Sequence, residues 1–399
     1  MYTTFIYFSF SIFEQNFLKF SGEIISANCK KKILHKLFKL PFDRRGMISI
    51  IGAGPSGNYL AFLLAKQSHD VHVYEDHKVI GTPVQCTGII TPELEKIIPV
   101  KKSFLTNKIN QAQIYAPNGS SLHVRFKKDD IIVDRTLFDS HLASLAEKAG
   151  AQYHLGQRFI ENKGKKMKIG EKFIETDILI GADGPFSRVA KTNGMWCDRK
   201  FVTGNQVTVE VDCEPKLVEF WLGIGLFGWL VPENDSVARV GIISYDQPDI
   251  YLKKLLDKRC PSAKVLHREP GAIPIYNPKQ ILQKDFVYLI GDAATQVKAT
   301  SYGGIVHGMK AAQILARDMQ HYQKNCRKEV GRDLYLSLLI RKAMDRFSEK
   351  DYNALVELFT QEKLKRVLET KSRDYPTKFL LDLILVEPRL LAFTRKFLF

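Results

Sequence analysis

The sequence predicts a mixed α/β (α+β) fold built from three parts. A strand–helix–strand unit with a glycine-rich turn begins at residue 48. Short runs of alternating apolar and polar residues occupy 111–129 and 201–279, as in an antiparallel β-sheet. The end of the chain, 331–399, has apolar residues at helical spacing among Lys and Arg. With 399 residues the chain has room for two or three domains.

The first unit has the features of a Rossmann-type dinucleotide-binding fold. An apolar strand runs into Gly52-Ala53-Gly54-Pro55-Ser56-Gly57, a helical pattern follows, and the next strand ends at Glu75. In such units the first glycine permits a tight turn, the second lets a pyrophosphate approach, and the third allows close helix packing. The acid accepts hydrogen bonds from ribose hydroxyls. We therefore expect Gly52, Gly54, Ser56, Gly57 and Glu75 to bind a dinucleotide.

Two later strand-to-turn junctions indicate which dinucleotide binds. Residues 176–188 form a strand that opens into Gly181-Ala182-Asp183-Gly184, and 286–294 form another that ends in Gly291-Asp292-Ala293-Ala294, before Gly304 and Ile305 open a helix. Together with the first unit they resemble the para-hydroxybenzoate hydroxylase-like flavoprotein superfamily, whose fold wraps one FAD. The resemblance implies cofactor contacts by Asp183, Gly291 and Asp292, with Asp292 on the ribityl chain. It places Gly304 and Ile305 under the flavin, where a helix dipole stabilises the reduced ring.

Further motifs resemble one branch, the geranylgeranyl reductase family (archaeal digeranylgeranylglycerophospholipid reductase-like). Cys86-Thr87-Gly88 resembles its flavin-facing segment, in a shorter form than the Cys-Gly-Glu-Gly of many relatives. The resemblance implies that all three residues contact the cofactor and that Cys86 takes part in catalysis, as the nearest candidate for a proton donor that the sequence does not identify. The run 134–139 matches a segment whose arginine, here Arg135, reaches the cofactor; alternatively, Asp134 caps a helix and Arg135 is solvated. Phe159 ends a strand that resembles the one near the adenine.

The third motif of the branch lies at 227–232. The family pattern Tyr-x-Trp-x-Phe-Pro lines the isoprenoid cavity, and this chain has Phe227, Trp229, Val231 and Pro232 at those positions. The resemblance implies that these four residues line the substrate cavity and that Trp229 also serves catalysis. The changed residues keep an apolar wall, which suits a polyene. A second departure is Thr295, where relatives often have a glycine that tolerates positive φ.

The resemblance implies an FAD-dependent reductase that saturates carbon–carbon double bonds of geranylgeranyl chains in membrane lipid precursors, by hydride transfer from reduced flavin N5. No second glycine fingerprint follows a strand, so we expect an external electron donor: a nicotinamide, a deazaflavin or a ferredoxin. An FAD-dependent aromatic mono-oxygenase using NAD(P)H and oxygen is one alternative, but Phe227 and Val231 offer no polar group to a phenol. A flavoprotein for electron transfer or quinone docking is another, although such proteins usually carry an iron–sulfur cluster.

The composition limits the classes of partner that the protein is expected to bind. The net charge of +16 favours polyanions, but no nucleic-acid-binding motif is present, so we expect none to bind. Six dispersed cysteines without a Cys-x-x-Cys pair predict reduced thiols, no metal site and a cytoplasmic protein. The apolar, Lys- and Arg-flanked segment 378–399 predicts either peripheral contact with the inner face of the cell membrane or a helical pair that packs on the core.

These observations divide the chain into four regions. Residues 1–46 are a leader: disordered, membrane-touching and amphipathic, or a start-site artefact preceding a natural start at Met47, which we favour. A Rossmann-type FAD-binding domain is expected at 47–110, 130–200 and 280–330. An inserted antiparallel β-sheet substrate domain is expected at 111–129 and 201–279, and a C-terminal helical region at 331–399.

Overall fold

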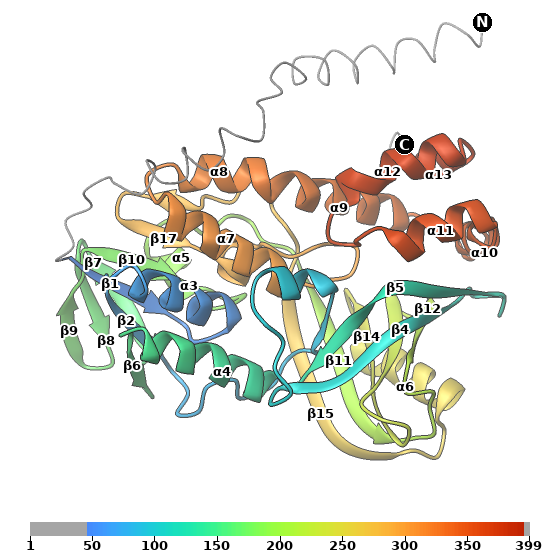
Figure 1. The fold of residues 1–399 in the computed structure, drawn as a ribbon, viewed down its shortest axis with the longest axis horizontal. Coiled ribbons are helices and arrows are strands. Elements are labelled where there is room, and N and C mark those ends of the chain that lie inside the picture. Colours follow the sequence, from blue (N-terminus) through green and yellow to red (C-terminus); the bar gives the residue numbers. More distant parts are fainter. Residues whose placement is uncertain (1–45, 395–399) are drawn as a thin grey trace, which may run out of the picture. The chain divides into compact units, whose positions relative to one another are not determined.

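The computed structural model describes residues 46–394; the leader up to residue 45 and the last five residues lie outside this range. A six-stranded sheet has the order β16-β17-β10-β1-β2-β6. Figure 1 labels its strands β17, β10, β1, β2 and β6. All neighbours are parallel except β16 and β17. Its strands are β1 (Met47–Ile51), β2 (Asp70–Glu75), β6 (Gln152–Leu155), β10 (Ile178–Gly181), β16 (Gln283–Lys284) and β17 (Val287–Leu289). The three strand-to-turn junctions of the sequence therefore meet at one edge, because β17, β10 and β1 are adjacent and parallel.

Helices cover this sheet. Helix α3 (Pro55–Ala65) contacts both α4 (Arg135–Lys148) and α7 (Ile305–Arg317). Ile48, Ile50 and Leu179 are almost fully buried, as expected for parallel strands covered on both faces. The connection from β6 to β10 forms a small antiparallel sheet of β7 (Phe159–Lys163), β8 (Lys166–Ile169) and β9 (Lys172–Glu175), and α5 (Arg188–Thr192) packs against β7.

The second large sheet has eight strands in the order β15-β11-β14-β13-β12-β4-β5-β3. They are β3 (Ile89–Ile90), β4 (Leu105–Tyr115), β5 (Ser121–Val133), β11 (Phe201–Glu210), β12 (Leu217–Leu222), β13 (Phe227–Pro232), β14 (Val237–Ser244) and β15 (Lys264–Pro274). Neighbours are antiparallel except β12 and β4. The predicted hairpin turn at 118–119 joins β4 and β5, and these strands extend to 105 and 133, past the expected 111–129.

The two faces of this sheet have different roles. Along β13, Trp229 and Val231 belong to one buried cluster, and Leu230 belongs to another on the opposite face. That opposite face is covered by α6 (Pro248–Arg259), whose Leu252 and Leu255 are buried. The period of two residues therefore directs Trp229 toward the remainder of the protein.

The described part of the region predicted to be helical, 331–394, is helical: α9 (Gly331–Met344), α10 (Glu349–Phe359), α11 (Glu362–Thr370), α12 (Pro376–Val386) and α13 (Leu390–Thr394). Helix α8 (Tyr322–Glu329) precedes it. Helices α10 and α11 pack on β5 (Figure 1). Two short 3-10 helices, η1 (Pro92–Lys96) and η2 (Gly291–Ala294), complete the described elements. Across residues 46–394, no helix combines the length and apolar character needed to cross a membrane. The predicted α/β fold class, with an inserted sheet and a helical end, is confirmed; the inserted sheet differs from the expectation in being mixed, because β12 and β4 are parallel.

Candidate active site

A cavity of about 1190 Å³ joins the two sheets. One part is lined by the turns that follow β1, β10 and β17, and another by β12, β13 and the C-terminal helices. Most of the predicted cofactor residues line it: Gly52, Gly54, Ser56, Glu75, Cys86, Thr87, Arg135, Phe159, Asp183, Gly291, Asp292, Gly304 and Ile305. Gly52 and Asp292, which are 240 positions apart in the sequence, therefore share one site.

The turn after β1 leaves room for a ligand at one glycine only. Gly52 has φ +106°, and a Cβ added at Gly57 would lie 2.1 Å from the Gly52 carbonyl oxygen. A Cβ at Gly54 would meet no protein atom within 4 Å. Helix α3 begins there without a side-chain cap, so the N–H groups of its first turn are free for an anion. These features fit a pyrophosphate.

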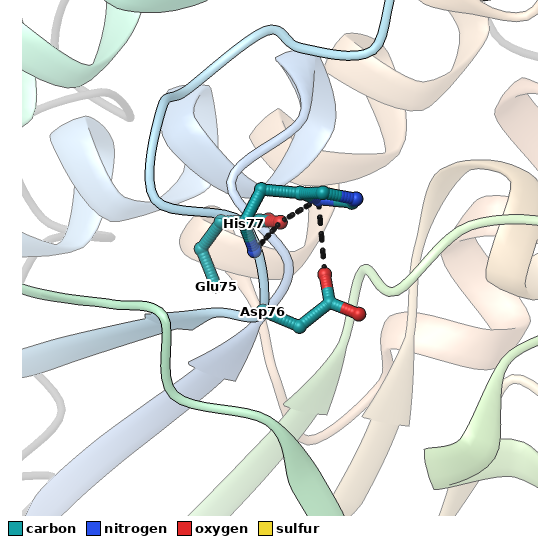
Figure 2. A group of neighbouring side chains, drawn as sticks. All are labelled: Glu75, Asp76 and His77. Carbon is teal, nitrogen blue, oxygen red and sulfur yellow. Dashed lines mark hydrogen bonds and ion pairs between the residues drawn. The ribbon is translucent and has the colours of Figure 1, made fainter.

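Glu75 is held in place by its neighbours, of which Figure 2 draws Asp76 and His77. Its Oε2 accepts a hydrogen bond from Ala53 N (2.7 Å), and its Oε1 accepts from His77 N (3.0 Å) and lies 2.6 Å from His77 Nδ1. His77 Nδ1 also lies 3.0 Å from Asp76 Oδ1. Each carboxylate oxygen of Glu75 can accept more than one hydrogen bond, so both remain available to ribose hydroxyls. Because Asp76 and His77 are exposed, we interpret this trio as support for Glu75.

We call the predicted cofactor residues that line the cavity the cradle. Asp292 and the start of α7 form the end of the cradle opposite to Glu75. Within residues 46–394 no hydrogen bond uses the Asp292 carboxylate, which lines the cavity. A Cβ at Gly304 would lie 3.0 Å from Asp292 Oδ1. Burial raises the pKa of Asp292, and Arg135 and Arg199 lower it. Gly304 is the N-cap of α7 and has no side chain to cap it, so a hydroxylated chain and an anionic ring edge both fit here.

Asp183 has a structural task as well. Its carboxylate accepts from Ser187 Oγ (2.6 Å), Arg188 N (2.7 Å) and Val189 N (3.0 Å), at the start of α5. It nevertheless lines the cavity, as does the buried Phe159.

Cys86 lies between a backbone donor and an arginine. Gly88 N donates to Cys86 Sγ (3.3 Å). The Arg135 guanidinium lies beside the same sulfur and donates to both carboxylate oxygens of Asp139 (3.1 and 2.8 Å). Burial lowers the pKa of Arg135, but Asp139 and Cys86 raise it by more. Asp134 does cap α4, accepting from Leu137 N, yet Arg135 is only 16% exposed, so the solvated alternative for Arg135 is wrong.

Gly88 does not line the cavity, although the sequence suggested a cofactor contact. A Cβ there would lie 2.4 Å from the Val133 carbonyl oxygen and 2.7 Å from Arg239 Nη1. The buried Arg239 donates to the Thr87 carbonyl oxygen (2.6 Å) and so fixes the Cys86 segment. Arg239 was not predicted, because its only signal in the sequence is one cation within the apolar strand 237–243.

Of the predicted substrate residues, Phe227, Trp229 and Val231 line the cavity and Pro232 does not. Alternation along β13 turns the Pro232 side chain to the other face. Its backbone carbonyl accepts a hydrogen bond from Asn107 Nδ2 (3.0 Å). Trp229 Nε1 donates to Gln206 Oε1 (3.2 Å), and Gln206 Nε2 donates to Glu269 Oε2 (2.5 Å). This chain of polar groups fixes the orientation of the indole ring.

The rest of the wall was not predicted. Tyr302 stacks on Phe227 with ring centroids 6.3 Å apart, and Met344 and Leu368 reach the cavity from α9 and α11. Further apolar lining residues are Ile114, Val124, Phe126, Phe220, Leu222 and Ile243. The C-terminal helices therefore contribute to the cavity wall, a placement that requires the tertiary fold.

The turn at Thr295 keeps the conformation expected of glycine. Thr295 is fully buried with φ +55°, and its Oγ1 accepts a hydrogen bond from Asn277 N (3.1 Å). A β-branched residue is rare in this region of φ. The hydrogen bond offsets part of that cost.

Known proteins resemble the chain along most of its length. The model of the NAD(P)-binding Rossmann-like domain matches residues 50–87. Digeranylgeranylglycerophospholipid reductase of Methanosarcina acetivorans is 26% identical over 363 residues, covering 80% of this chain and 89% of the relative. The protein of that name in Methanothrix thermoacetophila is 27% identical over 362 residues, covering 80% and 93%.

Solved structures share the fold. A geranylgeranyl bacteriochlorophyll reductase-like protein from Thermoplasma acidophilum superposes with a TM-score of 0.76 at 22% identity, over 87% of this chain and 98% of that one. A flavin-dependent brominase gives a TM-score of 0.65 at 15% identity, over 88% and 99%. The resemblance to the geranylgeranyl reductase family, predicted from the segments around Cys86, Arg135 and Trp229, is thus confirmed by relatives along 80% of the chain.

Proposed function

We propose that the protein is an FAD-dependent oxidoreductase that saturates carbon–carbon double bonds of geranylgeranyl chains in a membrane-lipid precursor. The observation that carries this proposal is the single cavity that joins a dinucleotide cradle to an apolar, aromatic wall. The names of the relatives, digeranylgeranylglycerophospholipid reductase, support the same substrate class.

The cradle residues have distinct tasks in this proposal. The first turn of α3 would hold the pyrophosphate, Glu75 the ribose and Asp292 the ribityl chain. Bound and reduced, FAD would supply a hydride at N5. The cradle thus orients the cofactor toward the wall that carries Phe227 and Trp229.

The wall residues bind the polyprenyl chain and exclude water. Unactivated alkenes resist attack by hydride, so the site benefits from a dry, fixed environment in which proton and hydride arrive together. Trp229 supplies a rigid surface because Gln206 holds its indole N–H. Cys86 is the side chain to which we assign the transferable proton, with Gly88 N and Arg135 positioning its sulfur.

Mass spectrometry tests the proposal. The FAD-loaded, dithionite-reduced protein is incubated anaerobically with a geranylgeranyl lipid, and we expect mass gains of two hydrogens for each double bond. Cys86→Ala should slow these gains by about 10²-fold or more if the thiol supplies the proton. Cys213→Ala is the matched control, because Cys213 is a free cysteine outside the cavity. Unchanged lipid mass with fully reduced wild-type protein would refute the reductase.

A mono-oxygenase is the second candidate, because Gln206 and Glu269 add polar groups to the cavity wall. Gln206 already binds Trp229 and Glu269, which leaves it little capacity to orient a phenol. Oxygen-dependent consumption of NAD(P)H would favour the mono-oxygenase. Inhibition by oxygen would favour the reductase.

We further propose an external electron donor and peripheral contact with an anionic membrane. Leu381, Leu385 and Leu391 on α12 and α13 are 47%, 70% and 48% exposed, near Lys378 and Arg389. Leu385→Ser should weaken cosedimentation with vesicles that contain an anionic phospholipid, and Ile250→Ser, at a 62% exposed position on α6, should not. Anaerobic bleaching of the flavin by a nicotinamide, a deazaflavin or a ferredoxin identifies the donor.

A further inference from the structure

Two cations line the cavity beside its apolar wall, and neither belongs to the cofactor cradle. Lys298 precedes α7, and Arg373 lies in the loop between α11 and α12. Each forms an ion pair with a buried carboxylate: Lys298 with Asp374 and Arg373 with Asp130. Lys298 is 8% exposed and Arg373 38% exposed, so Arg373 is the more accessible of the two cations.

Further charges surround this pair. Lys96 and Lys310 lie 2.6 and 3.9 Å from Glu93 oxygens. Lys310 and Lys378 lie 4.1 and 4.4 Å from the centroid of the Tyr375 ring, whose hydroxyl donates to Glu93. We call this group the Arg373 cluster; its cations are Lys96, Lys298, Lys310, Arg373 and Lys378, and its carboxylates are Glu93, Asp130 and Asp374.

The Arg373 cluster has an excess of two positive charges, five cations against three carboxylates. The adjacent His307 adds none at neutral pH, because burial lowers its pKa to about 4. An unbalanced positive charge beside a low-dielectric cavity attracts an anion. An anion bound in the cavity would balance part of this excess.

Arg373 can bind an anion while it remains paired. Its Nη2 donates to Asp130, and its guanidinium lies 4.5 Å from the centroid of the Phe126 ring, which also lines the cavity. A guanidinium has five N–H donors in one plane, and the stacking leaves the plane's edge open. This fork suits two oxygens of a phosphate.

We propose that the Arg373 cluster binds the phosphate ester of an anionic lipid headgroup, with Arg373 as the contacting residue. The isoprenoid chains then lie along the neighbouring apolar residues, Val124, Phe126, Leu222 and Leu368. The inference rests on the proposed function, since it assigns the headgroup of that same substrate. It makes Arg373 a determinant of specificity for phosphorylated over uncharged isoprenoid lipids.

Binding of two matched lipids tests the inference. Both carry the same geranylgeranyl chains; one has a phosphate headgroup and the other a free hydroxyl. Their Kd values for the full-length FAD-loaded protein are measured by calorimetry in a neutral detergent. Arg373→Gln should raise Kd for the phosphorylated lipid by about 10-fold or more, as expected for loss of a charged hydrogen bond, and leave Kd for the hydroxyl lipid within about two-fold.

Two further variants make the result specific. Arg373→Lys should be intermediate, because it keeps the charge and loses the fork. Arg366→Gln, an exposed arginine on α11 that does not line the cavity, should bind both lipids like the wild type. Should Arg373→Gln unfold because Asp130 is left unpaired, the double variant Arg373→Gln/Asp130→Asn removes both charges and repeats the measurement.

Equal weakening for both lipids, or no weakening for the phosphorylated one, would overturn the inference. The binding readout does not require turnover. A wild type that prefers the phosphorylated lipid but adds no hydrogen would refute the proposed reductase and leave the headgroup site standing. A wild type that binds both lipids with equal affinity and reduces both would refute the headgroup site and leave the proposed reductase standing.

Discussion

Gly57 packs against Gly52 so closely that a side chain cannot fit between them: a Cβ at residue 57 would lie 2.1 Å from the Gly52 carbonyl oxygen. Gly57→Ala must therefore shift α3 away from the turn that follows β1. We expect a loss of about 3 kcal/mol or more in the free energy of unfolding of the apoprotein, measured by urea denaturation.

Gly54→Ala separates packing from ligand binding. No protein atom lies within 4 Å of the added Cβ, and Gly54 lies outside the left-handed region of φ. The apoprotein should lose less than about 1 kcal/mol of stability, whereas FAD affinity should fall by about 10-fold or more because the methyl group occupies the path of the pyrophosphate. Equal FAD binding by Gly54→Ala and the wild type would show that the pyrophosphate lies elsewhere.

Glu75→Gln should weaken FAD binding without disturbing the fold. The amide nitrogen of Gln must face either Ala53 N or the His77 side, and both positions now hold a carboxylate oxygen. Loss of charged hydrogen bonds predicts a rise in FAD Kd of about 10-fold or more, measured by flavin fluorescence during titration of the apoprotein. Glu171→Gln, at an exposed glutamate that does not line the cavity, is the control, and similar Kd values for the two variants would contradict the ribose assignment.

Thr295 lets strain and hydrogen bonding be weighed against each other. Thr295→Gly removes the strain of φ +55° and also the acceptor of the hydrogen bond that Asn277 N donates, so the two effects oppose each other. Thr295→Val keeps the strain and leaves the N–H without its partner, which should cost about 1–3 kcal/mol. Thermal unfolding should therefore rank glycine, the smaller residue, above valine.

The lowered pKa of His307 predicts how the free energy of unfolding depends on pH. The ring is 2% exposed, and burial first, then Lys298 and Lys310, lower its pKa from 6.5 to about 4. Below pH 6.5, His307 binds a proton in the unfolded chain but not in the folded chain. The free energy of unfolding therefore falls as the pH decreases toward 4. The loss should reach about 2 kcal/mol at pH 5.

The measurement is the free energy of unfolding of the wild type and of His307→Gln between pH 7 and 5. The difference between the two proteins isolates His307 from His141 and His154, whose pKa values are also lowered by burial. Asp374, with a lowered pKa, contributes only near and below the ordinary pKa of Asp, about 3.9. Parallel curves for the two proteins would show that His307 does not titrate in this range.

The cradle was predictable because its residues act through the backbone near them. Gly52, Gly57 and Asp292 lie in short motifs whose turn geometry is local, so spacing alone indicates their place. Trp229 was predictable in the same way, from a six-residue motif. Pro232 was not, because a motif does not state which face of a strand each residue takes.

The remaining wall depends on contacts between distant segments. Leu368 lies on α11 and Arg373 in the loop after it, a region whose sequence predicts helices but not the sheet on which they pack. Only the packing of α11 on β5 brings them to the cavity. Arg239 resembles an ordinary exposed residue of an antiparallel strand, and its burial follows from the arrival of the 87–88 segment over β14.

The participation of α9 and α11 in the cavity wall has a consequence for biosynthesis. When the ribosome has added residue 317, the end of α7, every strand of both sheets and the whole cradle have been synthesised. Phe126 and Leu222, however, pack with Phe359 of α10 and Leu368 of α11, which are synthesised later. An apolar sheet face of this kind is prone to aggregate. The nascent chain can therefore acquire its cofactor early, but it must be protected from aggregation until its last helices cover the apolar face of the sheet.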